Sequence, residues 1–120
     1  MNSLRKSKKI VNSYVQLVYN NQLEAQKDCK KYIKEVKELR EDIEDYIKKQ
    51  SDIFKERCNK SVRIWMMKEV SVYDTIKRKV SMFLINEELN RISGDLACAG
   101  ILIKNLDIVE GRLTQFDKLL

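Results

Sequence analysis

The side chains that most often carry out chemistry are scarce and scattered in this chain. There is no histidine, and the three cysteines, Cys29, Cys58 and Cys98, are too widely spaced to suggest a disulfide framework or a CxxC ligand pair. Zinc and other transition-metal sites depend on histidine or clustered thiols, so none is expected. A serine or cysteine nucleophile would need lysine or a carboxylate as its base, and no spacing singles out such a pair. We therefore predict a protein that is not an enzyme, with no catalytic, cofactor-binding or metal-binding residues.

The net charge of +6 is unevenly distributed along the chain. Glu24 is the first acidic residue, so the N-terminal end carries only positive charge, in a basic patch of Arg5, Lys6, Lys8 and Lys9. Such a patch attracts an acidic protein, an anionic membrane surface or nucleic acid, although a solvated, lysine-coated helix end gives the same pattern. Lysine outnumbers arginine and no nucleic-acid-binding motif is present, which disfavours sequence-specific recognition of nucleic acid.

The elements that would position any functional residue are helices. The chain has no proline and only three glycines, and a repeat of apolar or neutral positions runs without a slip from residue 11 to residue 53. Alternate steps of four and three keep one seam of a helix facing a partner helix. The members of this seam are Val11, Val15, Val18, Gln22, Ala25, Cys29, Tyr32, Val36, Leu39, Ile43, Tyr46, Gln50 and Ile53.

The fold class that we predict is all-α: an antiparallel three-helix bundle or coiled coil with a long first helix. We expect one helical domain over residues 1–120, with helices at about residues 7–57, 62–90 and 95–119. Apolar residues recur at helical spacing in the second helix as well, at Val62, Trp65 or Met66, Val70, Tyr73, Ile76, Val80 and Phe83 or Leu84.

The two turns of this bundle are inferred from capping residues. Asn59 tolerates the conformation that ends a helix, and Ser61 can cap the next one. Gly94 lies between two further capping residues, Ser93 and Asp95, and has the freedom that a turn needs. If the chain does not turn at Gly94, the last two helices fuse, and the alternative fold is a long two-helix coiled-coil hairpin.

The last expected helix is apolar over a wide arc. One side carries its own seam, and the other flank exceeds what one seam can bury. We predict that this flank binds a partner, because uncovered apolar surface usually marks an interface. Its residues are Ile101, Leu102, Ile108 and Leu119. Trp65 and Met66 form a second bulky cluster, which is either core or a further partner contact.

One segment resembles a known family. Residues 45–56, Asp-Tyr-Ile-Lys-Lys-Gln-Ser-Asp-Ile-Phe-Lys-Glu, are similar to the Tyr-Asp-(Ile/Leu)-Lys-Lys-Gln segment of tubulin-binding cofactor A. The first two residues are in the inverted order, and the proline that follows in the family is not present. The resemblance implies a small three-helix chaperone of β-tubulin. The hairpin alternative is similar in outline to the stalk proteins of bacterial type III export machines.

We predict a non-enzymatic interaction or scaffold subunit that acts through coiled-coil packing with a protein partner or with its own copy. A small chaperone or cofactor for a single client, and a secretion-machine stalk or chaperone hairpin, are the alternatives. No small-molecule substrate is expected. No stretch contains the roughly 20 apolar residues that span a bilayer, and no secretory signal is recognisable, so we expect a cytoplasmic or nuclear protein.

Overall fold

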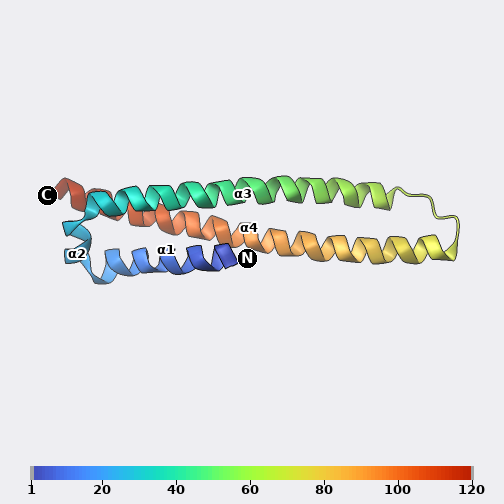
Figure 1. The fold of residues 1–120 in the computed structure, drawn as a ribbon, viewed down its shortest axis with the longest axis horizontal. Helices are drawn as coiled ribbons and strands as arrows, with labels where there is room; N and C mark the ends of the chain where they lie inside the picture. Colours follow the sequence, from blue (N-terminus) through green and yellow to red (C-terminus); the bar gives the residue numbers. More distant parts are fainter. Residues whose placement is uncertain (1, 120) are drawn as a thin grey trace. The chain divides into compact units, whose positions relative to one another are not determined.

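The computed structural model describes residues 2–119, with side chains from residue 4 onward. Its elements are α1 (Asn2–Asn20), α2 (Gln22–Lys27), α3 (Cys29–Trp65) and α4 (Val72–Leu119), shown in Figure 1. The described residues contain no strand, and the predicted class, an all-α antiparallel helical bundle, is confirmed. The chain divides into two compact units: unit 1 comprises Met1–Ile47 and Cys98–Leu120, and unit 2 comprises Lys48–Ala97.

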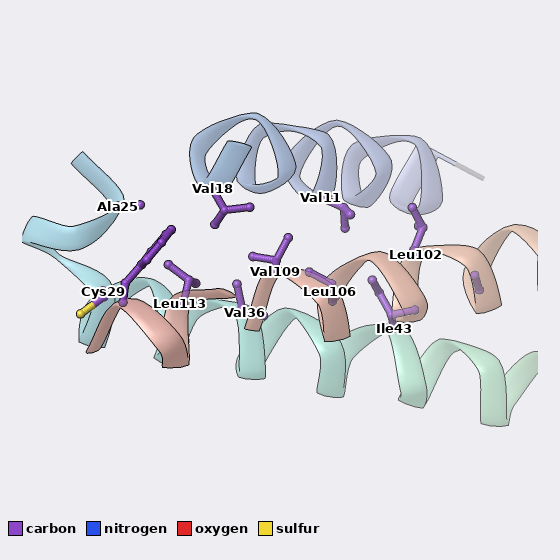
Figure 2. Packing of buried hydrophobic residues seen from close by; sticks show 12 residues of the cluster. Val11, Val18, Ala25, Cys29, Val36, Ile43, Leu102, Leu106, Val109 and Leu113 are labelled. Carbon is purple, nitrogen blue, oxygen red and sulfur yellow. The ribbon is translucent and has the colours of Figure 1, made fainter. Parts of the chain in front are cut away.

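Unit 1 is a bundle in which three long helical segments pack together. The α1 helix, the first part of α3 and the last part of α4 lie side by side, and α3 runs antiparallel to the other two (Figure 1). Side chains from all three meet in one apolar cluster, in which Val11 and Val18 of α1 point toward α4 (Figure 2). The fully buried positions of α4 include Leu106, Val109 and Leu113. This unit holds the main core of the protein.

The predicted seam is confirmed in unit 1 at the positions that recur every seven residues. Val11, Val18 and Ala25 are completely buried, and Cys29, Val36 and Ile43 on α3 are buried with them. The seam therefore marks the inner surface of the bundle, as a coiled-coil repeat requires.

The seam does not lie on one continuous helix, and the bounds expected for the first helix, residues 7–57, are wrong. The chain leaves helical geometry at Asn21, with φ −135° and ψ 58°, and again at Asp28, with φ −121° and ψ 31°. The Asn21 side-chain amide donates a hydrogen bond to Glu24 Oε2 at 2.6 Å, across the first turn of α2. These two corners allow α1 to fold back beside α3, so one repeat supplies two helices of the bundle.

Unit 2 is an antiparallel hairpin of two helices, the end of α3 and the beginning of α4 (Figure 1). The turn expected at Asn59 and Ser61 is wrong, because α3 continues to Trp65. Asparagine and serine permit a turn but do not force one, and the Ser61 hydroxyl instead lies 3.8 Å from Met82 Sδ on α4. The chain reverses over residues 66–71.

The second expected turn, at Gly94, is also wrong: α4 runs without interruption from Val72 to Leu119. No glycine in the described residues has positive φ, so Gly94 does not use the freedom that suggested a turn. Ile92 and Ala99 are buried on either side of it, and their burial holds this segment helical. The last two predicted helices are thus fused, as in the hairpin alternative, although unit 1 retains three helices.

Unit 2 has a thinner core than unit 1. Its buried hydrophobic residues are Ile85 and Ile92. An ion pair joins its two helices, with Arg57 Nε 2.9 Å from Glu88 Oε1. No helix in the described part of the chain contains an apolar stretch long enough to cross a bilayer.

The continuity of α4 predicts the effect of changing its glycine. Gly94→Ala should raise the free energy of unfolding by about 0.5–1 kcal/mol, because alanine favours a helix interior. The added Cβ would meet no atom within 4 Å. Urea unfolding measures the change, with the equivalent Gly111→Ala variant as a control for another open position in the same helix. Destabilisation by Gly94→Ala alone would show that the chain turns at this residue.

Candidate interaction surface

The residues that were predicted to bind a partner on the last helix do not share one environment. Ile101, Ile108 and Leu119 are exposed, by 59%, 51% and 79%. Leu102 is only 4% exposed and belongs to the core of unit 1. Its assignment to a partner-binding flank is therefore corrected: α1 packs against this side of α4 and covers it (Figure 2). The arc is wide because it serves two neighbouring helices.

The other predicted contacts are accessible. Trp65 and Met66, at the end of α3, are 63% and 75% exposed, so they are not core residues. The basic patch residues Arg5, Lys6, Lys8 and Lys9 lie exposed on α1, which has no acidic residue in its first turn. The basic patch belongs to unit 1, whereas Trp65 and Met66 belong to unit 2.

The largest group of exposed apolar side chains lies in unit 2, at the start of α4. These residues recur at steps of three and four, the spacing of one helical face. They are 53% to 77% exposed. We call them the outward stripe: Val72, Tyr73, Ile76, Val80, Phe83 and Leu84.

The outward stripe lies on the side of α4 opposite to α3. Ile85 is 6% exposed and faces the interior of the hairpin, and Met82 contacts Ser61 of α3. Ile76 precedes Ile85 by nine residues, which is two and a half helical turns and therefore the opposite side of the helix. Within unit 2, α4 thus has two apolar faces and one helical neighbour.

The loop that joins the two helices is held by specific contacts. The Asp74 N–H donates to Ser71 Oγ at 3.2 Å, and the Val70 N–H donates to Asp74 Oδ2 at 3.2 Å. The first bond is that of a serine N-cap, and the second ties the residue before the cap to the first turn, which explains why α4 begins at Val72. The guanidinium of Arg78 lies 4.7 Å from the centroid of the Trp65 ring and 2.7 Å from Glu69 Oε1.

Further exposed apolar residues lie at the end of α3 and in this loop, apart from the outward stripe. Val62, Met67 and Val70 are 56%, 56% and 87% exposed, beside Trp65 and Met66. Monomeric proteins rarely expose large contiguous apolar patches unless these bind something. The outward stripe can therefore bury apolar groups of another molecule.

The sequence alone placed Tyr73, Ile76 and Val80 on one helical face with Phe83 or Leu84, but it did not show which way that face points. Periodicity reports that apolar residues share a side, not which neighbour covers it. The signal that could have located the loop is Ser71-Val72-Tyr73-Asp74, a serine followed three residues later by a carboxylate. It precedes an apolar run, as helix N-caps commonly do.

In unit 1, two titratable side chains form hydrogen bonds between helices. The Tyr14 hydroxyl of α1 donates to Glu35 Oε2 on α3 at 2.5 Å, and burial with this bond raises the pKa of Tyr14. Burial also raises the pKa of the Cys29 thiol, which donates to Asp117 Oδ1 at 3.4 Å. Among the described residues, no group of histidine, cysteine, aspartate or glutamate is arranged to hold a metal ion.

These environments predict different reactivities for the three free thiols. Cys98 is exposed, Cys58 is half-buried and Cys29 is buried with a raised pKa. A disulfide reagent should therefore label Cys98 first and Cys29 last, because the thiolate is the reactive form and access limits attack. Time-resolved mass spectrometry of the native protein measures the order, with labelling in urea as the control. Reaction of Cys29 as fast as Cys98 would contradict its place in the core.

The corrected position of Leu102 predicts a large difference between two adjacent residues. Leu102→Ala should lower the free energy of unfolding by about 2–4 kcal/mol, since it removes buried methyl groups from the core. Ile101→Ala, which changes an exposed neighbour, should lower it by less than about 0.5 kcal/mol. The urea midpoints of the two variants measure this difference in stability. Equal shifts would place Leu102 on the surface, where the sequence pattern had put it.

Comparison of the chain with protein-family models, with curated protein sequences and with solved structures gave no match. The functional interpretation of the outward stripe therefore depends on the chemistry of the chain's own residues.

Proposed function

We propose that the protein is a non-enzymatic interaction subunit that packs a helix of a protein partner against the outward stripe. The observation that carries this proposal is the exposure of a helical seam in unit 2, Tyr73, Ile76, Val80 and Phe83, opposite the side that α3 covers. A second helix buries such a seam by the same packing that joins helices within a coiled coil.

The energetics of unit 2 support an interaction role. A two-helix hairpin buries little surface, and the buried apolar residues here are Ile85 and Ile92. A third helix on the outward stripe would bury several large side chains at once. Burial of each such side chain is worth roughly 1.5–3 kcal/mol relative to exposure, before the cost of association is subtracted. Aromatic anchors such as Tyr73 and Phe83 are typical of residues that dominate an interface.

The position of the stripe also supports a binding role over a structural one. Its residues lie on α4, whose backbone is fixed by packing against α3 and by the Ser71 cap. A rigid helix presents its side chains with little loss of conformational freedom on binding. The surface is therefore preorganised to receive another helix.

The proposal predicts that charges within the outward stripe abolish partner binding. The double variant Ile76→Glu with Val80→Glu should weaken binding by roughly a hundredfold, which corresponds to about 2.7 kcal/mol. The matched control is Ile101→Glu with Ile108→Glu, because this pair lies on the same helix and has nearly the same exposure, 59% and 51% against 57% and 53%. Circular dichroism should show equal helicity for both variants.

Quantitative pull-down from the cells that express the protein measures the effect. We expect the wild type and the control variant to retain the same partner, and the stripe variant to lose it. Loss in the control variant alone would move the interface to the C-terminal part of α4. Equal retention by all three proteins would contradict a role for either surface.

A further inference from the structure

The charges around the outward stripe define the chemistry of its partner, and this inference rests on the proposed function. Residues 60–84 contain six basic side chains and two acidic ones. The basic residues are Lys60, Arg63, Lys68, Lys77, Arg78 and Lys79. A partner that approaches this segment therefore meets a positive local potential.

Both acidic residues of the segment are engaged within unit 2. Glu69 pairs with Arg78 at 2.7 Å and accepts a hydrogen bond from Thr75 Oγ1 at 2.9 Å. Asp74 accepts the N–H of Val70 in the helix cap. Lys77 and Lys79 are exposed, and neither forms an ion pair with another residue in the part of the chain that the structure describes. Lys77 and Lys79 therefore stand beside the stripe without an ion-pair partner in unit 2.

The two lysines occupy the positions that select a partner helix. In a coiled coil, the residues that border the seam on each side meet the bordering residues of the other helix, and their charges set partner choice. The seam positions are Tyr73, Ile76, Val80 and Phe83, and the bordering residues are Val72 and Lys79 on one side and Lys77 and Leu84 on the other. None of these four bordering residues is a carboxylate, and Glu87 takes the next seam position after Phe83.

We propose that the partner is an acidic amphipathic helix, with an apolar seam bordered by aspartate or glutamate. Such a helix would bring carboxylates beside Lys77 and Lys79 while its apolar residues cover the stripe. Charge complementarity of this kind fixes partner and register.

A second copy of the chain fits this surface poorly. An antiparallel pair brings each lysine beside the same lysine of the other copy, and a parallel pair sets Lys77 and Lys79 beside Val72 and Leu84. Neither arrangement supplies a carboxylate. An anionic bilayer also fits less well, because Glu87 follows Phe83 by one turn on the stripe's own face and would be driven toward the lipid surface.

The test uses the full chain and two synthetic peptides of several heptads each. Both peptides have leucine and isoleucine at the seam; one has glutamate at the bordering positions and the other has lysine. Neither peptide pairs well with itself, because its bordering charges repel. Fluorescence anisotropy measures binding to the wild type, to Lys77→Glu with Lys79→Glu, and to Ile76→Glu with Val80→Glu.

We expect the acidic peptide to bind the wild type at least about tenfold more tightly than the basic peptide, with an affinity that falls as salt is added. The lysine-to-glutamate variant should reverse this preference, and the stripe variant should bind neither peptide. Equal binding of both peptides to the wild type would overturn the acidic partner but leave the outward stripe as an interface. Binding of a peptide by the stripe variant as tightly as by the wild type would overturn the interface itself.

Two further measurements test whether a second copy of the chain or an anionic bilayer binds the outward stripe instead. Sedimentation of the protein alone at micromolar concentration should show a monomer, and a dimer that Ile76→Glu with Val80→Glu dissociates would assign the stripe to a second copy. Co-sedimentation with vesicles of phosphatidylcholine and phosphatidylserine should leave the protein in solution. Vesicle binding that is lost in Lys77→Glu with Lys79→Glu would assign the surface to anionic lipid. Either result would overturn the proposal of an acidic helix.

Discussion

The burial of apolar side chains on α4 is the constraint on which the structure depends. A helix buries an apolar face only against another element, and α4 carries apolar residues on more than one side along most of its length. In unit 1 this demand is met, because α3 and α1 both pack on α4 and enclose Leu106, Val109 and Leu113. In unit 2 the only helical neighbour is α3, so the same helix presents an outward stripe that nothing within that unit covers. The difference between the units lies in the number of neighbouring helices.

The corners at Asn21 and Asp28 make this arrangement possible. They turn the first part of the chain back on itself, so that α1 becomes the third helix of unit 1. The bundle is then tied by contacts between its helices, such as the Tyr14–Glu35 hydrogen bond and the 3.1 Å approach of Arg40 Nε to Asp107 Oδ1. Polar contacts at the edges of the apolar core fix the register of the helices, while apolar burial supplies most of the free energy.

The sequence predicted the helical class and the seam well, because a seven-residue repeat reports directly which residues share a buried side. Val11, Val18, Val36 and Ile43 are all in the core, as that repeat requires. The repeat could not reveal the corner at Asn21, because Val18 and Ala25 keep the seven-residue step through it. Turns at Asn59 and Gly94 were predicted wrongly, since these residues tolerate a turn but the packing of their neighbours decides. Among the predicted partner contacts, Trp65 and Met66 are exposed, and their role stays a prediction, whereas Leu102 is a core residue because α1 folds over it.

The central claim is that the apolar surface of unit 2 is uncovered in the isolated protein and is covered by a partner. A tryptophan within the outward stripe reports on this directly: Phe83→Trp places one at an exposed seam position, and Trp65→Phe removes the single natural tryptophan, which lies on α3. Acrylamide quenching of the fluorescence of this double variant is the most direct measurement. The account predicts the red-shifted, readily quenched emission of a solvated indole in the protein alone, at all concentrations tested, and protection from quenching when the acidic helix is added. A blue-shifted emission that resists quenching in the isolated monomer would show that the surface is already buried, and would contradict the account.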